Sequence, residues 1–121
     1  MAKWVADSVL DAALDAIAAA TIMTACSAQP TTRTEAVTTY ALADVTMDSG
    51  DYSKANGDSS GRKLTVAQQA GVTVDSSGTA THVALCDGSN LLYVTTCISQ
   101  ALTAANTVTF NSWKIEIADP T

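Results

Sequence analysis

Residues 79–97 read TATHVALCDGSNLLYVTTC, two stretches rich in alternating apolar and polar residues on either side of an Asp-Gly pair. Asp-Gly favours a tight hairpin turn because glycine accepts the positive φ that such turns require. With the turn centred on Gly88 and Ser89, Cys86 is expected to face Leu91. The stretch therefore predicts an antiparallel hairpin at the centre of a mainly β fold.

The register of this hairpin divides its side chains between two faces. One face is expected to be core, with the pairs Leu85–Leu92, Val83–Val94 and Thr81–Thr96. The other face carries the pairs Ala84–Tyr93, His82–Thr95 and Ala80–Cys97. This second face is also fairly apolar, so we expect the N-terminal helix or a neighbouring subunit to cover it. Cys86 and Cys97 would lie about 20 Å apart along the hairpin, too far for a disulfide.

The remaining segments extend the β pattern. Further strands are predicted at 40–47, 63–69, 70–75, 106–112 and 113–119. Residues 48–62, rich in Gly, Ser and Asp, predict a long exposed loop, whereas 31–39 fit either a short helical turn or an extended arm. We therefore expect one domain over residues 1–121, with a helix at about 7–20 and a β-sandwich at about 21–119. Its sheets are expected to be antiparallel, in a β-sandwich or jelly-roll-like arrangement.

The stretch IMTACSAQP, residues 22–30, has two interpretations, a lipoprotein cleavage site or the first strand of a folded domain. Asp7, Asp11 and Asp15 interrupt the preceding apolar run, which a signal peptide does not tolerate. The same residues recur every fourth position, as on the polar face of an amphipathic helix. We therefore expect residues 2–25 to be retained and folded, with Asp7 or Ser8 as the N-cap and Asp11 facing outward.

Composition limits the classes of function. The chain has 121 residues and a net charge of -6, which argues against a nucleic-acid partner, and no apolar run is long enough for a membrane span. The three cysteines, Cys26, Cys86 and Cys97, have no metal-binding spacing and favour free thiols in a reducing compartment. No metal or cofactor is therefore expected.

The sequence contains few candidates for a chemical site. His82 is the single histidine and is expected to be structural. Asp48, Asp51 and Asp58 share one polar segment, but their spacing does not fit a calcium loop. Tyr52 beside Asp51 and Asn56 is the one candidate for stacking a sugar ring. No catalytic residue is predicted, and we expect a protein that is not an enzyme.

Four stretches that together span almost the whole chain resemble a family of small tailed-bacteriophage virion proteins. They are MAKWVADSVLDAALDAI, CSAQPTTRTEAVTTYALAD, SGRKLTVAQQAGVTVDSSGTATHVALCDGSNLLYVTTC and NTVTFNSWKIEIADP. The resemblance implies a structural protein encoded among head and tail genes, without a catalytic residue. This sequence departs from the family at Ala105, where relatives carry glycine, so the turn there is expected to differ.

Within that family, a small acidic β domain resembles capsid decoration (cement) proteins. The resemblance implies a place on the outer capsid surface after assembly in the host cytoplasm, with the major capsid protein as partner. We expect a homo-oligomer, dimer or trimer, with Trp4, Leu91, Tyr93 and Trp113 as candidate interface residues. Two alternatives remain, a tail-fibre or receptor-binding β-sandwich and a head–tail connector or tail subunit.

Overall fold

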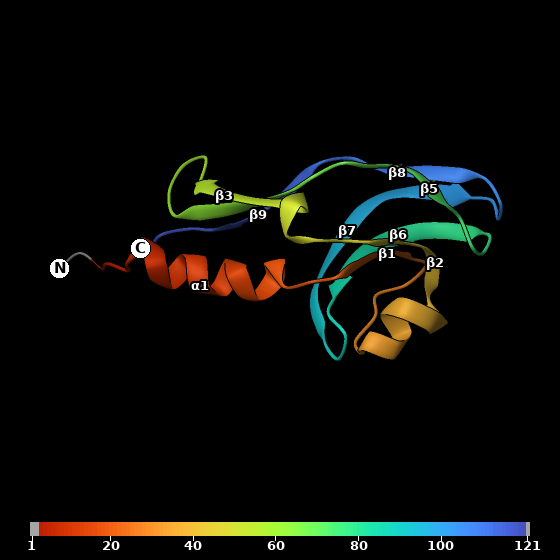
Figure 1. Cartoon of the computed structure of the whole chain (residues 1–121), viewed down its shortest axis with the longest axis horizontal. Coiled ribbons are helices and arrows are strands. Elements are labelled where there is room, and N and C mark those ends of the chain that lie inside the picture. The colour runs from red at the N-terminus through yellow and green to blue at the C-terminus, as the bar shows by residue number, and fades with distance from the viewer. Residues whose placement is uncertain (1–2, 121) are drawn as a thin grey trace.

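The computed structural model describes residues 3–120 and has the mainly β architecture that the sequence predicts, with one main helix near the N-terminus. All paired strands are antiparallel. The chain is elongated, with the helix at one end (Figure 1). The elements are α1 (Asp7–Ala18), β1 (Ile22–Cys26), η1 (Glu35–Thr39), β2 (Ala41–Thr46), η2 (Ser49–Asp51), β3 (Tyr52–Asn56), β4 (Arg62–Val66), β5 (Gln69–Thr73), β6 (Gly78–Cys86), β7 (Leu91–Leu102), β8 (Thr107–Phe110) and β9 (Trp113–Ile117).

Three sheets form the β part. The largest has the order β2-β1-β6-β7, a second has the order β3-β4-β9, and β5 and β8 form a two-stranded sheet. An isolated bridge between Ala43 and Val74 joins β2 to the end of β5. The strands β7-β6-β1-β2-β5-β8 therefore follow one another around a partly closed barrel. Although β7 and β8 are consecutive in the chain, they do not pair within the described residues, so the barrel is open between them.

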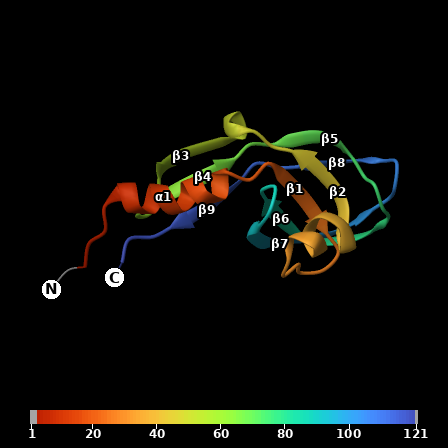
Figure 2. The ribbon, with the colours of Figure 1, turned by 60° about the horizontal axis from the view of Figure 1, so that its bottom comes forward.

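Helix α1 packs on the β3-β4-β9 sheet (Figure 2). Leu10 and Leu14 are buried, whereas Val9 is 58% exposed. The prediction that Asp7 or Ser8 is the N-cap was wrong. Ala6 takes the extended conformation of a cap, and Asp7 begins the helix. An acidic residue in the first turn still suits the helix dipole, because exposed N–H groups there favour negative charge.

The segment 48–62 is largely exposed, as predicted, but the prediction that it is a loop was wrong. Asp48 caps a short 3-10 turn, and β3 and β4 then pair as a hairpin. The connection between them is tight at Gly61, whose φ is +70°, and a Cβ there would overlap the carbonyl oxygen of Ile117. Polar composition suggested a loop, but an edge strand with one hydrated face has much the same composition.

The β6–β7 hairpin forms, but its predicted register was correct only at Cys86 opposite Leu91. A bulge then shifts the pairing by one residue, so that Leu85 faces Tyr93 and Ala84 faces Val94. Because successive side chains alternate between faces, this shift moves Tyr93 to the core face and Val94 to the other. The observed pairs are Leu85–Tyr93, Ala84–Val94, Val83–Thr95, His82–Thr96, Ala80–Gln100, Thr79–Ala101 and Gly78–Leu102.

The sequence suggested α1 or a neighbouring subunit as the cover of the second apolar face of the hairpin, but the segment 31–40 packs there instead. Ala36 from this segment is buried against Cys26, Ala84 and Cys86. Residues 33–39 are helical, which resolves the ambiguity of this segment in favour of a helical turn. Arg33 fastens the segment by donating from Nε to the Asp87 carbonyl oxygen at 2.7 Å. A short local segment therefore completes this face within the chain.

Candidate interaction surface

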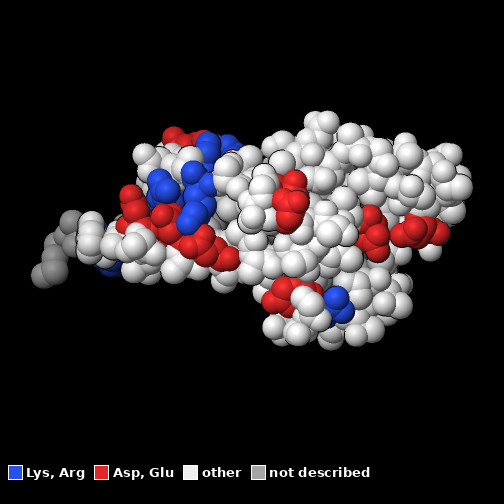
Figure 3. All heavy atoms as spheres, in the orientation of Figure 1, with Lys and Arg blue, Asp and Glu red and all other residues white. Residues whose placement is uncertain are grey.

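Charged side chains are distributed unevenly over the molecule. In Figure 3 they gather over the end formed by α1 and β3, while most of the opposite end is free of them on the visible face. The sequence has the same imbalance, because Asp87 is the one Asp, Glu, Lys or Arg between Asp75 and Lys114. That interval holds β6, β7 and β8. Depletion of charge distinguishes the centres of protein interfaces from ordinary surface.

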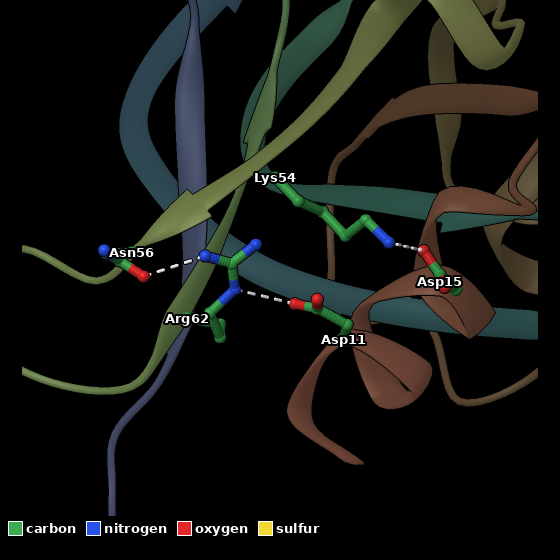
Figure 4. Close-up of polar contacts among 5 residues, drawn as sticks. All are labelled: Asp11, Asp15, Lys54, Asn56 and Arg62. Carbon is green, nitrogen blue, oxygen red and sulfur yellow. Dashed lines mark hydrogen bonds and ion pairs between the residues drawn. The ribbon is translucent and has the colours of Figure 1, made fainter. Parts of the chain in front are cut away.

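At the charged end, the acidic stripe of α1 pairs with strands β3 and β4 (Figure 4). Arg62 Nε lies 2.8 Å from Asp11 Oδ1, and Lys54 Nζ lies 2.6 Å from Asp15 Oδ1. Asn56 accepts a further hydrogen bond from Arg62 at 2.8 Å. The expectation that Asp11 faces solvent was wrong, because its side chain is only 25% exposed. The hydrogen bond from Arg62 to Asp11 also raises the pKa of the guanidinium, with burial acting against it.

A hollow of about 550 Å³ lies where the barrel is open, and Lys114 is the one charged residue in its wall. Strand β7 bounds one side, and β8 with the start of β9 bounds the other. The wall is mostly apolar, and hydroxyl and amide side chains complete it. The lining residues are Ala25, Ala80, Val83, Thr95, Thr96, Cys97, Ile98, Gln100, Leu102, Val108, Thr109, Phe110, Asn111, Ser112, Trp113 and Lys114.

A second bulge places Ile98 at the edge of this hollow. Because Ala80 faces Gln100 and His82 faces Thr96, three residues of β7 lie opposite Thr81 alone. Ile98 lies in this bulge, and its side chain is 94% exposed. Among residues 3–120 the exposed large hydrophobic residues are Trp4, Val9 and Ile98, of which Ile98 is the most exposed.

Of the four predicted interface residues, Tyr93 and Trp113 are brought together, whereas Trp4 and Leu91 lie elsewhere. Trp4 is 83% exposed and precedes α1 in the chain, and α1 lies at the end of the molecule away from β8 (Figure 1). Leu91 packs against the cluster under segment 31–40. Tyr93 packs against the main core, where its ring stacks on Trp113 with centroids 5.9 Å apart.

Trp113 is the one of the four predicted residues that lines the hollow. Its buried indole N–H has no acceptor among the described residues. Ile98 and Phe110 were missed by sequence reasoning. The long uncharged interval around them was the signal that could have pointed to this surface.

The cysteine, histidine and tyrosine side chains considered as candidates for chemistry are partly or fully buried or hydrogen-bonded within the fold. Burial raises the pKa values of the Cys26, Cys86 and Cys97 thiols, which keeps them protonated and weakly nucleophilic at neutral pH. His82 Nδ1 lies 2.8 Å from the Thr81 hydroxyl. Tyr52 donates its hydroxyl to the Ala20 carbonyl oxygen at 3.0 Å and packs against the core. Its hydroxyl is therefore used in a contact within the fold.

The acidic residues at 48–58 are used in local contacts. Asp48 accepts from the Gly50 N–H at 2.9 Å, and Asp51 Oδ2 accepts from the Asp48 N–H at 2.9 Å. Asp58 pairs with Lys63 and Lys114. In residues 3–120 no three or more His, Cys, Asp or Glu side chains cluster in a way that could hold a metal ion. No helix in that range is long and apolar enough to cross a membrane.

Comparisons of the chain with protein families, with curated proteins and with solved structures found no match.

Proposed function

We propose that this chain is a non-enzymatic structural protein of a tailed-bacteriophage virion. Within the virion it acts as a decoration protein, bound to the outer surface of the capsid shell and stabilising it. The resemblance of its sequence to small phage virion proteins supports the setting. The observation that supports a binding role is the separation of a charged, self-paired end from an uncharged face with a hollow and an exposed isoleucine.

An uncharged face of this kind suits contact with protein. Burying charged groups is costly unless each finds a partner, whereas threonine, serine and amide side chains lose less on leaving water and can pair across an interface. Residues 88–113 contain no Asp, Glu, Lys or Arg, yet they form most of the wall of the hollow. The proposed partners are the major capsid protein and further copies of this chain.

The charged end suits the hydrated side of such a particle protein. Its cations pair with aspartates of the same chain, so few positive charges remain to attract a polyanion. With a net charge of -6, the chain is repelled by packaged DNA, in keeping with a place outside the shell. The decoration role would therefore present the uncharged face to protein and the acidic surface to solvent.

The location can be tested by imaging purified virions of the phage that encodes this chain. We expect density for the chain on the shell lattice, and we expect particles that lack the chain to lose DNA at lower temperature than complete particles. Density at the tail tip would support a receptor-binding role instead, and density in the neck would support a connector. Either location would contradict the decoration proposal, as would equal heat resistance of the two particles.

A further inference from the structure

A raised side chain and a hollow lie next to each other on the uncharged face. Ile98 projects from the bulge in β7 and at the same time lines the edge of the hollow. The wall beyond it includes Val83, Leu102 and Phe110. Both halves of an apolar contact, the projection and the recess, are therefore present on one surface of one chain.

The fold of the single chain does not account for the position of Ile98. At 94% exposure its side chain adds almost nothing to the core. It lies in a bulge that interrupts the pairing of β6 and β7 over residues 97–99. Bulges commonly redirect a side chain at a site of contact, and a large apolar residue beside an apolar recess is characteristic of an interface.

We propose that this face is a two-fold contact between two copies of the chain, in which Ile98 of each copy fills the hollow of the other. A two-fold contact brings the same surface of both copies together, so it requires a surface complementary to itself. A projection and a recess side by side meet this requirement, because rotation about an axis between them exchanges the two. The hollow, at about 550 Å³, has room for an isoleucine side chain.

The absence of charge from this part of the sequence favours a second copy as the occupant. A charge near a two-fold axis would face the same charge on the partner, at a cost that rises as water is excluded. Residues 88–113 contain no Asp, Glu, Lys or Arg. Lys114, the one cation that lines the hollow, already pairs with Asp58 of its own chain. Polar residues such as Thr95, Gln100 and Asn111 can form hydrogen bonds across the contact.

This contact deepens the proposed function, because it specifies how copies of the decoration protein would associate, and to that extent rests on it. The purified chain is nevertheless sufficient to test it. A chain that dimerises through Ile98 but leaves no density on the shell would contradict the decoration role alone. A monomeric chain found on the shell would contradict the two-fold contact alone.

Sedimentation equilibrium over a range of concentrations is the first measurement. We expect the unmodified chain to show a monomer–dimer equilibrium and Ile98→Asp to weaken it about tenfold or more, as for a central apolar interface residue. Ile98→Ala should weaken dimerisation less than Ile98→Asp. Val9→Asp is the matched control, since Val9 is 58% exposed on α1, and it should leave the equilibrium unchanged.

Isotope-filtered NMR on a mixture of labelled and unlabelled chains is the second measurement. Phe110, the single phenylalanine, lines the hollow, so its ring protons should show a contact to the Ile98 methyl groups of the other copy. A monomeric unmodified chain would overturn the proposal. So would a dimer that Ile98→Asp leaves intact but Trp4→Ala disrupts, because the N-terminal segment would then carry the association.

Discussion

The helix and strands of this molecule are held together by different contacts at its two ends. At the charged end, α1 lies on β3 and β4 through a buried apolar contact framed by the Asp11–Arg62 and Asp15–Lys54 pairs. At the other end, β6, β7 and β8 have no such pairs. They are held by strand pairing and apolar core side chains, and the barrel stays open between β7 and β8.

This difference shows where a further partner can bind. Charged groups that already pair within the chain remain hydrated, and a binding partner would have to remove that water. An uncharged surface with a hollow can be dehydrated at lower cost. The four predictions that follow test whether the two ends are held together as this comparison states, and the expected effects decrease from the first to the last.

The largest effect is expected from Leu14→Ala at the charged end. Leu14 is fully buried, and its loss would leave a cavity between α1 and the sheet that costs about 3 kcal/mol in the free energy of unfolding. Val9→Ala on the same helix should cost less than about 0.5 kcal/mol, because Val9 is exposed. Urea unfolding measures both. Similar losses in the two variants would mean that α1 is not anchored by its apolar face.

Tyr52 joins the charged end to the strand that leads into the barrel, and its role can be tested at high pH. Burial, and then the nearby Asp51 and Asp48, raise the pKa of Tyr52 to about 12. In the unfolded chain a tyrosine loses its proton near pH 10. Its contribution to stability is therefore fully present below pH 10 and is lost as pH rises towards 12.

Tyr52→Phe removes both this titration and the hydrogen bond to Ala20. We expect a loss of about 1 kcal/mol at neutral pH. The difference between the two proteins should become smaller as pH rises through the alkaline range, as measured by urea unfolding at a series of pH values. A constant difference would show that the Tyr52 hydroxyl ionises as freely in the folded chain as in the unfolded one.

A substitution in the turn between β7 and β8 is expected to stabilise the fold, unlike the changes above. Ala105 has φ of +74°, a left-handed conformation that costs a residue with a Cβ about 1–2 kcal/mol. Glycine removes this cost but adds backbone entropy to the unfolded chain. Ala105→Gly should therefore stabilise the fold by about 0.5–1 kcal/mol in thermal unfolding. Ala104→Gly, which relieves no such strain, should not stabilise it.

The smallest effects are expected from the two ion pairs. Asp11→Leu removes the carboxylate that pairs with Arg62. Asp15→Leu removes the more exposed pair with Lys54. Exposed pairs contribute little and are screened by salt. We expect both variants to fold, with the larger fall in the midpoint of thermal unfolding for Asp11→Leu. If Asp15→Leu were the more damaging, the Asp11–Arg62 pair would not be the main ionic contact of α1.

Several elements were predictable because local sequence determines them. The apolar spacing of residues 9–17 and the acidic residues between them specify a helix, which the structure has at Asp7–Ala18. Asp87 specifies the β6–β7 turn, since its carboxylate accepts the N–H groups of Ser89 and Asn90 at 2.7 and 2.6 Å. These bonds lower the pKa of Asp87. Such signals act over a few residues, so they are readable without knowledge of the partners.

The interaction surface was only partly predictable, because its geometry depends on strand register. Alternation alone placed Tyr93 on the open face, but the bulge beside Leu91 turns it into the core against Trp113. Ile98 is exposed within the bulge at 97–99, and no residue pattern in that segment predicts the bulge. A one-residue shift has little effect on local preference but exchanges the two faces of a strand.

By itself, the sequence determined the N-terminal helix, most of the strands, the net charge, and the uncharged interval from 88 to 113. The tertiary structure alone decided that the acidic stripe of α1 pairs with β3 and β4, that segment 31–40 covers the second sheet face, and that Ile98 lies beside a hollow. The physical reason is that helix and turn preferences are local. Register, covering segments and hollows depend instead on how residues far apart in the chain fill space together.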